Sequence, residues 1–152
     1  MSYAYLHLVL NHIPLIGVGI ALFLLILAGI REDLGLRRAA WMVLILAGII
    51  TAPTYLTGTL AEETVEKLPD VTEELIETHE ERALIALIAT ILSTLLGGIC
   101  LWMDETKGFI PRSLRILTEL TVALAFGVLL WTAQAGGQIR HTEIRSSTSI
   151  SN

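Results

Sequence analysis

The chain has 152 residues, of which 53% are hydrophobic and 16% are charged, and its formal net charge is −5. This composition lies outside the range of ordinary soluble domains and indicates a membrane protein. The negative charge and the apolar character also argue against a nucleic-acid-binding protein.

Four long apolar runs follow one another along the chain, at residues 13–30, 39–58, 83–103 and 116–135. Each is close to the ~20 residues that a helix needs to cross a bilayer core. The runs are continuous rather than alternating, and Leu and Ala dominate them, which favours helices over strands. The sequence therefore predicts an all-α membrane protein, a four-transmembrane-helix bundle. Residues 1–145 form its single domain, and residues 146–152 form a flexible polar tail.

The loops between these runs differ in charge. Segments 31–38 and 103–115 carry six basic residues against four acidic ones, whereas the opposite side carries four basic residues against ten acidic ones. Cytoplasmic loops of membrane proteins are enriched in Lys and Arg. We therefore expect a multi-pass protein with both termini on the outer side of its membrane.

The acidic segment between the second and third runs has helical features of its own. Residues 62–68 can continue the second helix until Pro69 stops it. Asp70, with Glu73 three residues later, resembles a capping box that starts the next helix, which we expect over residues 71–103. The second and third helices should then extend ~2–3 turns beyond the outer face.

All four histidines of the chain fall near the outer interface. His79 shares a helical stripe with Leu75, Ile76, Ala83 and Ala86, and His141 shares one with Leu130, Gln134, Gly137 and Ile144. Both are therefore predicted to point inward. His7 and His12 are five residues apart, which puts them ~140° apart around a helix. They are suited to two different sites, one on each side of the first helix.

Two bis-histidine sites account for all four side chains, and low-spin haem b takes two axial imidazoles. The sequence thus predicts two haem b groups near the outer face, with His7, His12, His79 and His141 as the iron ligands. Arg82 and Arg140 lie in the same layer and suit propionate carboxylates. Gly137 lets a porphyrin approach the backbone closely.

Two other interpretations stay open. Histidines and a carboxylate such as Glu62 could hold a non-haem iron, zinc or copper ion in the outer end of the bundle. Alternatively, the histidines are interfacial polar residues of a cofactor-free assembly subunit. A stand-alone enzyme is not indicated, because the chain has no nucleophile–base pair, phosphate-binding loop or cysteine cluster. An electron carrier or redox subunit fits better.

Four different short motifs occur along the chain in a particular order. They are His7, His12 and Pro14, then Ala52-Pro53 with Thr57-Gly58, then His79, and finally Gly136-Gly137-Gln-Ile-Arg140-His141. In this order they resemble the bacterial four-helix membrane family catalogued as domain of unknown function 2231, over nearly the whole chain. Leu8 and Ile13 replace the Pro and the Phe of that family's first motif, and the spacer before Arg140-His141 is shorter.

The resemblance implies a multi-pass protein of the bacterial inner membrane. It also implies an association with redox domains, since some relatives look fused to Rieske-type or cytochrome c-like modules. A cytochrome of this kind would pass electrons between a quinol-linked complex and a periplasmic cytochrome, with membrane lipid around it. The sequence leaves the oligomeric state open.

Overall fold

The computed structural model describes residues 2–145, so the predicted polar tail at 146–152 lies outside the described residues. The described elements are α1 (Tyr3–Leu10), α2 (His12–Arg31), α3 (Leu34–Thr59), α4 (Glu62–Val65), α5 (Glu73–Lys107), α6 (Arg112–Arg140) and the 3₁₀ turn η1 (Thr142–Ile144). Four stretches are long and apolar enough to cross a membrane: Tyr3–Arg31, Leu34–Thr59, Glu73–Lys107 and Arg112–Arg140. The prediction of an all-helical fold with four helices long and apolar enough to span a membrane is confirmed for residues 2–145.

The first spanning stretch is interrupted at Asn11, between α1 and α2. Pro14 explains the interruption, because it has no N–H to donate to the Leu10 carbonyl four residues earlier. Asn11 keeps right-handed helical angles, with φ −60° and ψ −25°. The chain therefore continues in nearly the same direction, and α1 is a tilted extension of α2.

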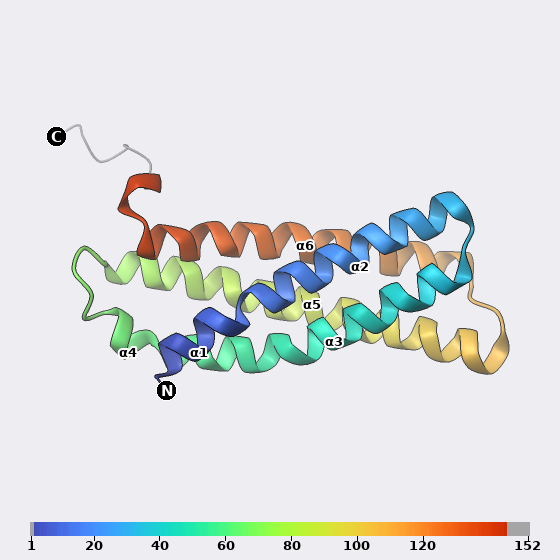
Figure 1. Cartoon of the computed structure of the whole chain (residues 1–152), viewed down its shortest axis with the longest axis horizontal. Coiled ribbons are helices and arrows are strands. Elements are labelled where there is room, and N and C mark those ends of the chain that lie inside the picture. The colour runs from blue at the N-terminus through green and yellow to red at the C-terminus, as the bar shows by residue number, and fades with distance from the viewer. Residues whose placement is uncertain (1, 146–152) are drawn as a thin grey trace.

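The four long helices form a closed bundle. α2 packs against α3 and α6, α5 packs against α3 and α6, and α1 packs against α3. Figure 1 shows both described ends of the chain and α4 at one end of the bundle, which we call the terminal end. The connections at residues 31–34 and 107–112 lie at the opposite end, which we call the loop end.

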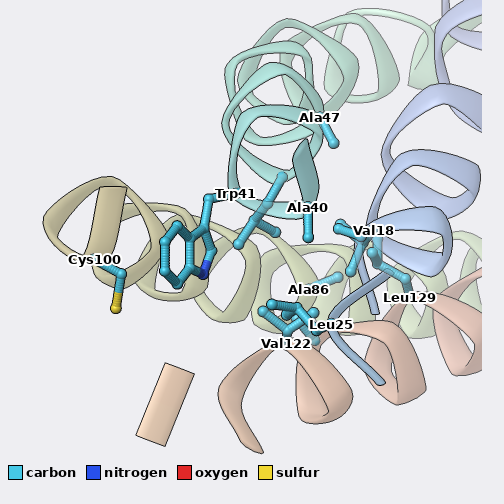
Figure 2. Packing of buried hydrophobic residues seen from close by; sticks show 12 residues of the cluster. Val18, Leu25, Ala40, Trp41, Ala47, Ala86, Cys100, Val122 and Leu129 are labelled. Carbon is cyan, nitrogen blue, oxygen red and sulfur yellow. The ribbon is translucent and has the colours of Figure 1, made fainter. Parts of the chain in front are cut away.

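Small side chains let the helices approach closely in the middle of the bundle. A Cβ on Gly48 would clash with the Thr94 hydroxyl, and a Cβ on Gly97 would lie 2.9 Å from a Leu44 methyl group. Trp41 is 1% exposed and reaches from α3 to α5 (Figure 2). Large apolar side chains cover the outside instead, as expected for helices that face lipid.

Two predictions about the segment after α3 are wrong. The second helix does not continue to residue 68, because α3 ends at Thr59 and the Ala61 N–H bonds the Gly58 carbonyl in a tighter turn before α4. Asp70 is not the cap of the next helix, since its φ of 63° is left-handed. Thr72, with extended angles, precedes the first turn of α5 instead.

Candidate cofactor site

Two of the four histidines come together at the terminal end. The rings of His7 on α1 and His79 on α5 have their centroids 6.4 Å apart, and their planes are nearly perpendicular at 82°. Both side chains are half-buried. The prediction that His79 faces inward is confirmed, and its stripe neighbours Ile76 and Ala86 are buried.

Each ring is fixed by a hydrogen bond to a backbone carbonyl on a neighbouring helix. His7 Nδ1 lies 2.9 Å from the Thr54 carbonyl oxygen of α3, and His79 Nδ1 lies 3.2 Å from the Thr132 carbonyl oxygen of α6. A carbonyl oxygen can only accept, so each Nδ1 carries the proton and donates. In the neutral form of such a ring the lone pair is on Nε2, the nitrogen that is left to bind a metal.

A glycine lies under each ring. A Cβ on Gly58 would stand 3.0 Å from Cε1 of His7, and a Cβ on Gly136 would stand 3.0 Å from Cε1 of His79. Any larger residue would push against the imidazole. In both cases the glycine lies four residues after the threonine whose carbonyl accepts the hydrogen bond. One helical turn therefore supplies both the space for the ring and the acceptor for its Nδ1.

Arg82 lies one turn from His79 on α5. Its Nη1 donates to the Trp131 carbonyl oxygen at 3.3 Å, and its guanidinium lies 4.3 Å from the centroid of the Trp131 ring. Within the described chain Arg82 forms no ion pair with a carboxylate. The Thr132 hydroxyl lies 3.0 Å from the Arg82 carbonyl oxygen, which ties α5 to α6 beside His79.

The other two histidines lie apart from this pair. His12 is exposed, and its Nδ1 lies 3.3 Å from the Leu8 carbonyl oxygen of its own helical segment. His141 is exposed as well, so its predicted inward orientation is wrong. It leaves the helix with φ −113° and ψ 98°, and its Nδ1 lies 2.9 Å from a Glu143 carboxylate oxygen. The backbone N–H of Glu143 and the His141 side chain lower the pKa of this carboxyl.

The remaining predicted site residues, Arg140 and Gly137, have surroundings other than the His7 and His79 rings. Arg140 is exposed at the end of α6. A Cβ on Gly137 would meet Ile144 rather than a histidine ring. Arg145 donates to the carbonyl oxygens of Gln138, Ile139 and Asp70, so it closes the end of α6 and holds the segment before α5.

Sequence reasoning did not identify α3 and α6, which supply the accepting carbonyls of Thr54 and Thr132, as partners of the two rings. The signal was present, because Thr54 and Gly58 on α3 have the same spacing as Thr132 and Gly136 on α6. Within residues 2–145, no group of three or more His, Cys, Asp or Glu side chains is arranged to hold a metal ion. The candidate site is therefore a pair of imidazoles to which the described residues add no third His, Cys, Asp or Glu ligand.

Comparison with known proteins adds no relative. No protein-family model, no curated protein and no solved structure matches this chain. The resemblance to a bacterial membrane family stays a prediction from the motifs.

Proposed function

We propose that this protein is a small membrane cytochrome b that carries electrons through one haem b held between His7 and His79. The observation that carries this proposal is the close pair of imidazoles, each with Nδ1 hydrogen-bonded to a carbonyl and, within residues 2–145, with no hydrogen bond at Nε2. A bound haem supplies reversible one-electron transfer.

The number of ligands distinguishes haem from other metal cofactors. Structural zinc takes four protein ligands, and catalytic zinc takes three. Haem iron has four ligands from the porphyrin and needs only two axial ligands from the protein. Since no third His, Cys, Asp or Glu side chain joins His7 and His79 in the described chain, two imidazoles fit haem better than a bare ion.

The distance between the two imidazole rings also fits two ligands of one metal ion. Two imidazoles that bind one metal from opposite sides, each through a nitrogen ~2 Å away, have centroids about 6 Å apart. The observed separation is 6.4 Å. Rotation about the bond between metal and nitrogen leaves this distance unchanged, so the angle of 82° between the ring planes is compatible with it.

The chain's own residues would hold the group in place. His7 is anchored to α3 and His79 to α6, so the ligands come from two different helix pairs of the bundle (Figure 1). Arg82 is held against Trp131 without a carboxylate partner in the described chain, and its guanidinium suits a propionate. Gly58 and Gly136 keep the two rings close to the helix backbones.

We propose one haem rather than the two expected from the sequence. His12 and His141 are exposed, and each is bonded within its own segment of the chain. They lack the carbonyl anchor on a second helix that fixes His7 and His79. A second haem therefore has no comparable support in the geometry.

We further propose that the protein lies in a bacterial inner membrane with the terminal end outside. The excess of Lys and Arg at the loop end supports this orientation. With 35 residues, α5 is about 50 Å long, which exceeds the ~30 Å hydrocarbon core, so its first turns extend beyond the outer face. The haem would then lie near the outer surface, where a periplasmic cytochrome or a quinol-linked complex exchanges electrons with it.

The test is the reduced-minus-oxidised visible spectrum of protein purified in detergent after haem-replete expression, with a pyridine haemochrome count. We expect a b-type α-band and one haem per chain. His7→Ala and His79→Ala should lose the band, whereas the matched controls His12→Ala and His141→Ala should keep it. A colourless wild-type protein would refute the proposal, and elemental analysis for iron, zinc and copper would then test a non-haem site. Loss of haem in His12→Ala and His141→Ala alone would refute the assignment of the ligands.

A further inference from the structure

An unpaired arginine lies near the opposite end of the bundle. Arg37, in the first turns of α3, is only 7% exposed. Its Nε is buried and has no hydrogen-bond partner, and within residues 2–145 no ion pair includes its guanidinium. A charge taken out of water without a partner is strongly destabilising, so this side chain needs a counter-charge.

The acidic side chains nearby do not supply it. Asp104 on α5 is also 7% exposed, but its carboxylate pairs with Nε of Arg38, the residue beside Arg37. In the described part of the chain, no ion pair joins Glu119 on α6 to Arg37. The Asp104 carboxylate thus pairs with Arg38, and the adjacent Arg37 has no ion-pair partner within residues 2–145.

The surroundings at the loop end are basic. The segments around residues 31–38 and 103–115 carry six basic residues against four acidic ones. On α6, the half-buried Arg115 lies one turn before Thr118, whose hydroxyl contacts Cys100 of α5 at 3.3 Å. Basic pockets between helices at the membrane surface are sites where anionic lipid headgroups bind.

We propose that Arg37 binds a phosphate group at the loop end of the bundle, of the kind that an anionic phospholipid carries. The planar guanidinium can donate two parallel hydrogen bonds to a phosphate, which an ammonium group cannot do. A lipid without its own positive charge is favoured, because the six basic residues repel a choline or ethanolamine headgroup. This inference does not depend on a cofactor at His7 and His79.

The experiment follows the thermal unfolding midpoint of delipidated protein in a neutral detergent. Phosphatidylglycerol, phosphatidylcholine and inorganic phosphate are added separately. Phosphatidylglycerol at saturating concentration should raise the wild-type midpoint by about 5 °C, and phosphatidylcholine should not. An equal rise with inorganic phosphate would identify a soluble phosphate as the ligand instead of a lipid. No rise with either anion would overturn the proposal.

Arg37→Gln should abolish the rise with phosphatidylglycerol. Arg112→Gln is the matched control, because it removes the same charge from an exposed residue at the same end and should keep the rise. Equal rises in both variants would overturn the proposal, since general attraction to the basic surface would explain them. If Arg37→Gln does not fold, native mass spectrometry of the wild type decides the question. Retention of phosphatidylglycerol but not phosphatidylcholine supports the site, and equal retention refutes it.

Discussion

In the middle of the bundle, Gly48 and Gly97 on α3 and α5 receive Thr94 and Leu44, whereas at the terminal end Gly58 and Gly136 receive the rings of His7 and His79. In the middle of the bundle, the absence of a side chain on glycine lets α3 and α5 pack directly on each other. At the terminal end, it makes room for an imidazole whose Nδ1 reaches the backbone one turn earlier.

The difference separates the part of the molecule that stabilises the fold from the part that carries the proposed cofactor site. The middle and loop-end half holds the fully buried side chains Val18, Trp41, Cys100 and Val122 (Figure 2), together with Leu44. At the terminal end the two histidines stay half-buried, and within residues 2–145 they form hydrogen bonds only through Nδ1. Substitutions in the two regions should therefore affect different measurements.

Trp41→Ala should give the largest loss of stability. The indole is 1% exposed and lies against Gly97 and Leu44, so its removal leaves a cavity that costs about 3–5 kcal/mol of unfolding free energy. Denaturation in mixed detergent and sodium dodecyl sulfate measures this change. Trp102→Ala is the matched control, because Trp102 is 57% exposed and should cost far less. Equal losses would show that Trp41 is not part of the stabilising core.

Gly48→Ala should come next, with a loss of about 1–3 kcal/mol from overpacking. Its new Cβ would clash with Oγ1 of Thr94 and would lie 2.8 Å from Cβ of Thr94, so α3 and α5 must move apart. Adding Thr94→Ala removes the first clash but leaves the second, and only partial recovery is expected. Full recovery in the double variant, measured by the same denaturation, would show that the backbones themselves are not in tight contact.

Gly136→Ala should affect the cofactor more than the fold. The new Cβ would stand 3.0 Å from Cε1 of His79, so the ring must tilt and its Nε2 loses its direction. Groups that orient metal ligands typically contribute about 10–100-fold to affinity, and we expect at least a tenfold weaker haem affinity with little change in unfolding free energy. Haem titration monitored by absorbance measures it. Gly127→Ala is the control, because its Cβ meets nothing within 4 Å, and haem affinity should not change.

How far the sequence could predict this site depends on where each residue lies relative to its helix. His79 lies inside α5, so its apolar neighbours three and four residues away revealed its inward face. His141 lies just past the end of α6, where helical periodicity no longer determines direction, and the stripe argument failed there. The contact of His7 with Gly58 depends on how α1 packs against α3, which the pattern of a single helix does not contain.

The smallest effect is expected at the exposed pair of His141 and Glu143. Hydrogen bonds from its own N–H and from His141 lower the pKa of the Glu143 carboxyl. Its contribution to stability is therefore present above the unfolded-state pKa and is lost as the pH falls through the lower folded-state pKa. Because both side chains are exposed, solvent screens the interaction and the contribution should be barely measurable. Glu143→Gln should leave the unfolding midpoint at pH 7 and the haem content unchanged, and it should remove a slight decline of the midpoint in acid. A clear loss of haem in this variant would contradict the separation of His141 from the cofactor site.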